Sequence, residues 1–172
     1  LGLRAGTLAA SSAFIVATVG VLGFVKAVRS AADFATELKV FQVNAGATAD
    51  EMERVSATAK QLGRDITLPG VTASDAAIAM TELAKAGLSV ANSMAAARGT
   101  LQLATAAQID NAAAAQLVSG ALNSFELDGT QAVKVADLFA GAAKSAQGSI
   151  QDFGPALAQV SAVAHGFGIS IG

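Results

Sequence analysis

Few side chains in this sequence are of the kinds that carry out chemistry, and their spacing forms no recognisable site. The one histidine, His165, has no second histidine, no cysteine and no carboxylate within four residues, so the spacing of metal ligands is missing. The chain has no cysteine, which excludes disulfides, thiolate ligands and a cysteine nucleophile. We interpret His165 as a side chain near a helix end, where positive charge is favourable.

The other polar features are explained by helix ends. The ending HGFGISIG superficially resembles a phosphate-binding loop, but it follows a predicted helix and has no Lys-Ser or Lys-Thr pair. We therefore interpret its glycines as residues that end the preceding helix. Five carboxylates fall near predicted helix starts, where the helix dipole stabilises negative charge: Asp50, Glu51, Asp75, Asp110 and Asp152. The sequence therefore predicts no catalytic residue, no cofactor, no metal site and no enzymatic activity.

The composition favours a helical protein that packs against neighbours. Hydrophobic residues make up 53% of the chain and charged residues 14%, a balance that excludes a disordered polymer. Alanine supplies roughly a quarter of the residues, and small side chains bury little apolar area each, so we expect a weak core and an oligomeric working state. The net charge is -2 and the basic residues are scattered, which predicts no specific nucleic-acid binding.

An uncharged run from Ala5 to Val25 is the most prominent segment. Its length just suffices to cross a bilayer, although glycine, serine and threonine dilute its hydrophobicity. A buried or oligomeric helix is the simpler explanation, and both interpretations stay open. The helical spacing continues beyond the run, which argues against a cleaved signal peptide. The candidate membrane-inserting or helix-packing side chains are Phe14, Ile15, Val16, Val19, Val21, Leu22, Phe24 and Val25.

Capping signals begin to divide the remainder into short helices. The spacing within Thr48–Glu51 is that of a capping box and predicts a helix that ends at Leu62. There Gly63 would adopt the left-handed conformation. The clearest break follows at Pro69–Gly70, and Thr72–Asp75 provides acceptors for the next helix start.

Further starts follow at similar spacing. Ser89 is a candidate cap for a stretch that Gly99–Thr100 would interrupt, so we predict two short helices there. Asp110 caps the next predicted helix, Asp128–Gln131 opens another, and Ser149–Asp152 starts the last.

The predicted fold is all-α, because no segment alternates with the period of a strand. It comprises one long N-terminal apolar and amphipathic helix followed by a series of short helices arranged as hairpins. We divide the chain into 1–45, a hydrophobic helix and candidate membrane-interacting segment, and 46–172, a helical domain. Leu88–Ser89, Leu127–Asp128 and Ile169–Ser170 recur at roughly 40-residue spacing, which hints at repeated hairpin units. The start at Leu1 instead of methionine favours a fragment of a longer polypeptide.

Four short segments carry a family resemblance: LAKAGL at 83–88, GTLQLA at 99–104, LNSFELD at 122–128 and VADLFA at 135–140. In this order they resemble the conserved helical region of phage tail tape measure proteins, the minor tail proteins of long-tailed phages, over about residues 60–170. The resemblance implies a structural protein in the lumen of the tail tube that sets tail length and leaves before the genome during infection. It also implies the virion tail tube or tail tip as location.

The implied partners are other copies of the chain, tail tube proteins, tail-tip proteins such as the distal tail and hub proteins, and tail assembly chaperones. Family members commonly carry apolar segments, so an alternative role is a membrane-inserting part of a DNA-passage channel, with the host membrane as a further partner and location. A generic helical interaction domain of a bacterial protein is the third hypothesis. The sequence leaves open whether the segment is extended or folded into hairpins.

Overall fold

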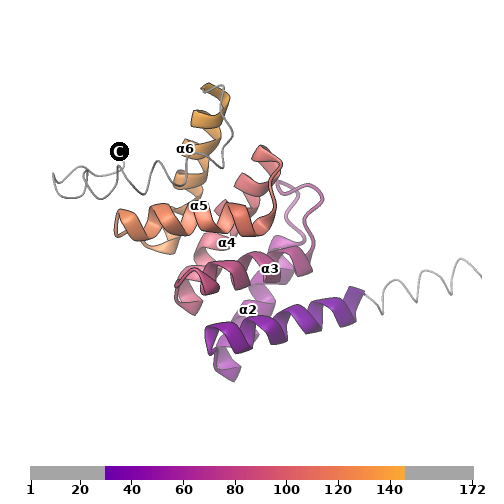
Figure 1. Cartoon of the computed structure of the whole chain (residues 1–172). Helices are drawn as coiled ribbons and strands as arrows, with labels where there is room; N and C mark the ends of the chain where they lie inside the picture. The colour runs from indigo at the N-terminus through magenta and orange to yellow at the C-terminus, as the bar shows by residue number, and fades with distance from the viewer. Residues whose placement is uncertain (1–29, 146–172) are drawn as a thin grey trace, which may run out of the picture. The chain divides into compact units, whose positions relative to one another are not determined.

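The computed structural model describes residues 30–145, which are almost entirely helical (Figure 1). By contacts the chain divides into two units, Leu1–Thr36 and Glu37–Gly172. Residues 30–36 of the first unit are helical, and the helix continues to residue 45. The second unit then contains α2 (Ala49–Leu62), α3 (Ala73–Lys85), α4 (Val90–Ala107), α5 (Asn111–Ser124), the 3-10 turn η1 (Gly129–Gln131) and α6 (Ala132–Ser145). No strand occurs among the described residues, and the all-α prediction is confirmed.

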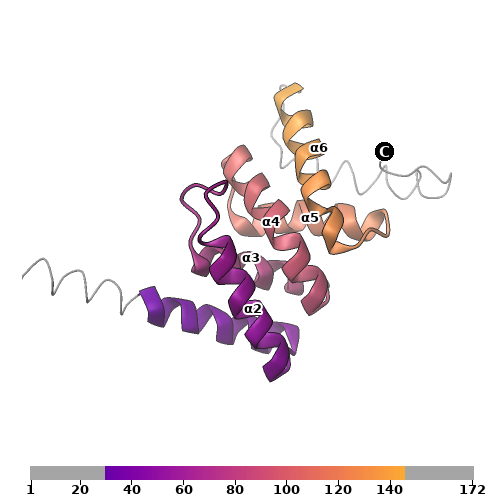
Figure 2. The same cartoon turned by 180° about the vertical axis from the view of Figure 1, so that it is seen from behind.

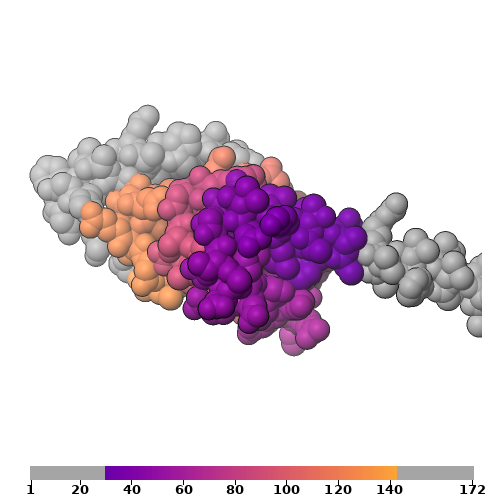
Figure 3. Space-filling model, turned by 90° about the horizontal axis from the view of Figure 1, so that it is seen from below, coloured from indigo at the N-terminus to yellow at the C-terminus, as the bar shows by residue number. Residues whose placement is uncertain are grey.

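Helix α4 is the centre of the second unit. It contacts α2, α3, α5, η1 and α6, and its contact with α6 is the most extensive between any two of the elements from α2 to α6 (Figures 1 and 2). The space-filling view shows the rose-coloured segment between the indigo early residues and the orange late ones (Figure 3). The short helices therefore surround one long helix instead of forming a chain of separate hairpins.

The core combines a few large side chains with many small ones. Ala114 and Ala115 of α5 are completely buried, as are Ala96 and Ala97 of α4. Small side chains permit close approach of helix axes, and the dense packing of a protein interior then supplies dispersion contacts along the backbones. The largest fully buried side chains are Phe41, Met80, Leu83, Leu101, Leu103, Leu122, Val55, Val118 and Val135.

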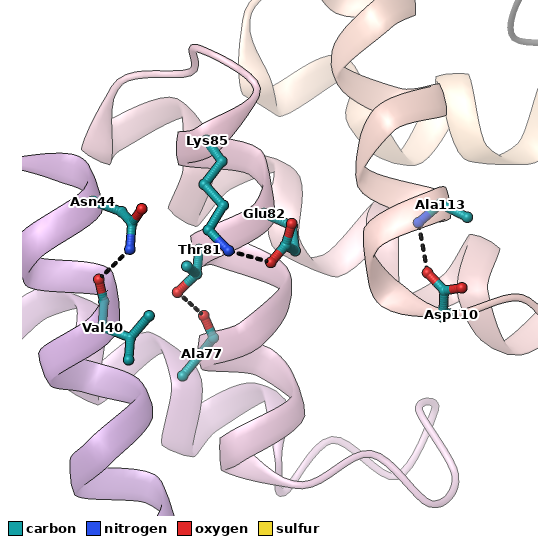
Figure 4. A network of polar contacts seen from close by, with 8 residues as sticks. All are labelled: Val40, Asn44, Ala77, Thr81, Glu82, Lys85, Asp110 and Ala113. Atoms are coloured by element: carbon teal, nitrogen blue, oxygen red, sulfur yellow. Dashed lines mark hydrogen bonds and ion pairs between the residues drawn. The ribbon is translucent and has the colours of Figure 1, made fainter.

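The helix starts form where the sequence predicts them. Thr48 and Glu51 form a complete capping box, and Thr72 forms another with Asp75. Ser89 and Asp110 cap α4 and α5, and the Asp110 carboxylate accepts a hydrogen bond from the Ala113 amide at 2.7 Å. Figure 4 shows this cap beside other short-range bonds, such as that from the Thr81 hydroxyl to the Ala77 carbonyl, which stay within one helix.

One turn geometry recurs at the helix junctions. A residue with positive φ is followed by an apolar residue and then by an N-cap, as in Gly46-Ala47-Thr48, Gly87-Leu88-Ser89, Gln108-Ile109-Asp110 and Glu126-Leu127-Asp128. In each case the apolar residue's amide donates to the carbonyl five residues earlier, at 2.8 to 3.2 Å. This is the Schellman bond that satisfies a helix's last carbonyls, so one helix ends as the next begins.

The predicted interruption at Gly99–Thr100 is wrong, because α4 runs unbroken from Val90 to Ala107. Glycine weakens an isolated helix by about 1 kcal/mol, but tertiary packing overrides that preference here. A Cβ on Gly99 would lie 2.5 Å from both the carbonyl carbon and the oxygen of Ala132. The absent side chain is therefore what lets α4 and the start of α6 touch through their backbones.

Two smaller predictions also need correction. Gly63 is right-handed, with φ of -68°, and not left-handed as predicted. It is required by space, since a Cβ there would lie 2.4 Å from the Ala73 amide nitrogen. Asp128 does not open a helix with Gln131, because it accepts hydrogen bonds from the amide and hydroxyl of Thr130 and so caps the 3-10 turn η1 that precedes α6.

Several predicted features lie outside the described residues. These are the apolar run with Phe14, Ile15, Val16, Val19, Val21, Leu22, Phe24 and Val25, the helix predicted from Ser149, Asp152, His165 and the glycine-rich ending. The division into 1–45 and 46–172 and the oligomeric state stay predictions. Within residues 30–145, no helix has the combined length and apolar character needed to cross a membrane.

Candidate functional site

The connection between α2 and α3 is a loop that Arg98 of α4 holds in place. The Arg98 guanidinium donates to the Asp65 carboxylate at 2.7 Å and to the Thr67 hydroxyl at 2.9 Å. Asp65 also accepts the amide and hydroxyl of Thr67, at 2.9 and 2.7 Å. Two loop residues and one side chain from more than thirty positions later thus form a single polar clamp.

The clamp keeps the Asp65 carboxylate charged. Hydrogen bonds from the Thr67 hydroxyl and amide lower the pKa of Asp65, and the nearby Arg98 charge lowers that pKa further. The Arg98 side chain is 43% exposed, so solvent screens the ion pair and its contribution to overall stability is small. Its effect is local, because it fixes the direction in which the loop leaves α2.

The same loop exposes an aliphatic side chain at its tip. Leu68 is buried and anchors one end of the loop, and Gly70, with φ of +81°, turns the chain back toward α3. Between the clamp residues, Ile66 is 94% exposed, the largest exposure of any large hydrophobic residue in the described part of the chain. Single exposed hydrophobic residues are common on protein surfaces, so Ile66 alone does not define a contact surface.

A shallow groove lies beside this loop, between α4 and α6. Its volume is about 260 Å³, and its lining residues are Thr67, Leu68, Gln102, Leu103, Thr105, Ala106, Ala136, Asp137 and Ala140. The Oε1 atom of Gln102 is fully buried and accepts no hydrogen bond, an exception to the usual pairing of buried polar groups. Asp137 is exposed on α6 and forms no ion pair within residues 30–145. Leu138, half-exposed, follows it on the same helix.

Of the carboxylates predicted at helix starts, three of the four that the structure describes are capping groups. Glu51, Asp75 and Asp110 accept amide hydrogen bonds at their helix starts, and Asp50 lies in the first turn of α2. The Thr48 amide and hydroxyl lower the pKa of Glu51, and the Thr130 hydroxyl and amide lower the pKa of Asp128. These bonds explain the acidic residues without catalysis.

Sequence reasoning missed the clamp and the groove. Arg98 gave no local signal, because its partners lie in another segment of the chain. Ile66 did carry a weak signal, since it is a lone aliphatic residue in the polar stretch RDIT, outside every helical pattern. The groove depends on how α4 crosses α6, which no single segment reveals.

The described residues define a helical packing module with a fixed loop and an adjoining groove. No group of three potential metal-binding side chains occurs between residues 30 and 145. What this arrangement can do is bind another surface through shape, apolar contact and a few polar groups.

Comparison with known proteins places this module in a family. The family model of phage-related minor tail proteins matches residues 56–172. The tape measure protein of Pneumococcus phage Dp-1 is 35% identical over 155 residues, which cover 90% of this chain and 13% of that protein. The chain therefore belongs to the phage-related minor tail protein family. It spans only a small part of the relative's length, and no solved structure matches it.

Proposed function

We propose that this chain is a helical part of a tape measure protein, packed in several copies in the lumen of the tail tube. In this role the whole protein sets tube length during assembly and is released at genome ejection. The observation that carries the proposal is the family match across residues 56–172, together with similarity to a tape measure protein along 90% of this chain.

Membership in the family supports a structural component of the phage tail. The proposed partners are further copies of the chain, tail tube proteins, tail-tip proteins and tail assembly chaperones. The module supports binding of this kind, because it offers a clamped loop and a groove lined mainly by small and aliphatic side chains. Its location would be the tail tube lumen or the tail tip.

A length-setting protein needs a dependable relation between residue number and distance. An α-helix provides one, since each residue adds 1.5 Å along the axis. Extended helical parts of the full-length protein would therefore supply most of the length. The compact packing around α4 would supply much less for each residue, so we assign this module to contacts with neighbours and not to length itself.

An in-frame deletion in the full-length gene tests the length-setting role. Removal of a helical block outside this module should shorten tails by about 1.5 Å per residue removed. Electron microscopy of purified virions measures the tail length directly. Tails of unchanged length after several such deletions of different size would overturn the role.

The uncharged run Ala5–Val25 favours a second candidate function, insertion into the host membrane after ejection. A synthetic peptide of residues 1–30 should then partition into liposomes, with a gain of helix signal in circular dichroism. The matched control peptide carries Val16→Asp and Val19→Asp and should stay in solution. This function would be excluded if both peptides partitioned equally into liposomes. It would also be excluded if neither peptide partitioned.

A further inference from the structure

We propose that residues 149–170 begin the next layer of a stack of helical hairpins, and that this layer packs on α5 and α6 as α5 packs on α3 and α4. The inference concerns how the module continues along the chain and does not depend on its role in a tail. Two observations carry it. The described hairpins α3–α4 and α5–α6 are equivalent position by position, and the signals that open and close their first helices recur in residues 149–170.

The first helix of each hairpin has the same pattern of burial. When the N-caps Thr72 and Asp110 are matched, every buried residue of α3 falls on a buried residue of α5, as Met80 does on Val118. The buried residues of α3 are Ala76, Ala77, Ala79, Met80, Thr81 and Leu83. Agreement along a whole helix indicates that α3 and α5 occupy equivalent surroundings.

The second helix of each hairpin repeats as well. When the caps Ser89 and Asp128 are matched, Ser93 of α4 falls on Ala132 of α6, and both are completely buried. The same matching brings three further buried residues of α4 onto buried residues of α6, namely Val135, Ala136 and Phe139. The two hairpins are therefore two copies of one structural unit.

The hairpins α3–α4 and α5–α6 are stacked on each other. Helix α3 contacts α5, and α4 contacts α6 (Figures 1 and 2). The helix that opens a hairpin also contacts the helix before it, since α3 contacts α2 and α5 contacts α4. Helix α4 is surrounded because it lies in the middle of this stack. Stacks of such units can be extended, because each unit contacts its neighbours in the same way.

The turn that joins the two helices of a hairpin recurs in residues 168–170. In the described turns a residue with positive φ precedes an apolar residue and an N-cap, at roughly 40-residue spacing. These turns are Gly46-Ala47-Thr48, Gly87-Leu88-Ser89 and Glu126-Leu127-Asp128. At the next interval the sequence reads Gly168-Ile169-Ser170. Glycine adopts positive φ more readily than any other residue, so this triplet suits the same turn.

The N-cap that opens a hairpin recurs too. Thr72 and Asp110 cap α3 and α5, and Ser149 follows Asp110 at nearly the same interval. After Ser149, the apolar residues Phe153, Leu157 and Val160 have the spacing of one helical face. The family match extends from residue 56 to residue 172, which supports a single unit that includes both the described hairpins and residues 149–170.

The repeat assigns one specific contact. Asn123, four positions before Leu127, donates from its side-chain amide to the carbonyl of Ala86, the residue that ends α3. His165 lies four positions before Ile169 and so matches Asn123. One unit further along the stack, His165 is therefore assigned a position beside Phe125, the residue that ends α5.

Paired cysteines test this contact in the full chain, which has no cysteine of its own. Phe125→Cys with His165→Cys should form an intramolecular disulfide under mild oxidation, because only cysteines that lie close together can be bridged. Mass spectrometry and the mobility of the monomer on a non-reducing gel measure the yield. The reference pair is Ala86→Cys with Asn123→Cys, whose contact is observed, and the control pair joins His165→Cys to Glu53→Cys on the exposed side of α2.

The yield of the Phe125–His165 pair should be at least about fivefold above the control pair and comparable to the reference pair. If the reference pair forms its disulfide and the Phe125–His165 pair does not exceed the control, the proposed stacking is wrong. Disulfides found only between chains, with none inside a chain, would overturn it equally.

A charge placed in the same segment gives an independent test that needs no cysteine. If residues 149–170 pack on the described hairpins, Leu157→Asp should lower the midpoint of urea unfolding by about 1 M, because it would bury a charge. Gln159→Asp places the same charge on the opposite side of the helix and should leave the midpoint nearly unchanged. Equal midpoints for the two variants would refute the packing of this segment.

Discussion

Two glycines in neighbouring helices should respond in opposite ways to the same substitution. Gly99 of α4 is buried, and a Cβ there would lie 2.5 Å from the carbonyl carbon and oxygen of Ala132 and 2.7 Å from the Val133 amide nitrogen. These are backbone atoms that cannot rotate away. Gly120 of α5 is exposed, and a Cβ there would meet nothing within 4 Å.

The magnitudes follow from two opposing effects. Overpacking against rigid backbone costs up to about 3 kcal/mol, whereas glycine to alanine in a helix gains about 1 kcal/mol. Gly99→Ala should therefore lower the free energy of unfolding by about 2 kcal/mol, because α4 and α6 must separate. Gly120→Ala has only the helix gain and should raise the free energy of unfolding by up to about 1 kcal/mol.

Urea unfolding followed by far-UV circular dichroism measures both values, since the chain has no tryptophan or tyrosine for fluorescence. Equal slopes in urea would show that the variants expose the same surface on unfolding. A Gly99→Ala variant as stable as the Gly120→Ala variant would refute the backbone contact between α4 and α6, and with it the reason for an uninterrupted α4.

Three further tests address the local structure. Gln108 adopts φ of 54°, so Gln108→Gly should stabilise the fold by about 1 kcal/mol in thermal unfolding. Gly87 adopts φ of 94°, so Gly87→Ala should destabilise the fold by a similar amount. Stability changes of the same sign for both variants would contradict the turn geometry. Thr72→Ala removes one capping box and should lower the free energy of unfolding by about 1 kcal/mol. Thr72→Ser is the control variant that retains the capping box. Because hydrogen bonds lower the pKa of Asp65 in the folded chain, its stabilising effect is present above about pH 4 and is lost as pH falls through the lowered pKa. Asp65→Asn should therefore flatten the loss of stability on acidification, and an acid titration identical to wild type would contradict the clamp.

The sequence was informative at four helix starts, where the structure depends on nearby residues. The capping pairs Thr48–Glu51 and Thr72–Asp75 set two helix starts, and Ser89 and Asp110 set two more. These signals are readable because donor and acceptor lie within three residues of each other. The absence of alternating strands was equally local, and the all-α prediction followed from it.

Most of the features that escaped prediction depend on residues far apart in the chain. Gly99 has the pattern of a helix break, and only its contact with Ala132 explains why the helix continues. Gln108 and Glu126 hold left-handed positions that sequence reasoning assigns to glycine. Their position before an apolar residue and an N-cap was the available signal, seen in part as the recurring Leu88–Ser89 and Leu127–Asp128 pairs. The clamp at Arg98 and the groove at Gln102 required the tertiary fold.

The most direct test of the central claim compares tail lengths per residue removed. If this module is compact in the virion, deletion of Ala49–Ser145 from the full-length protein should shorten tails by much less than the roughly 150 Å that a straight helix of that length would span. A deletion of equal size in an extended helical region should produce nearly the full shortening. Equal shortening from both deletions, measured by electron microscopy, would contradict the compact helical module described above.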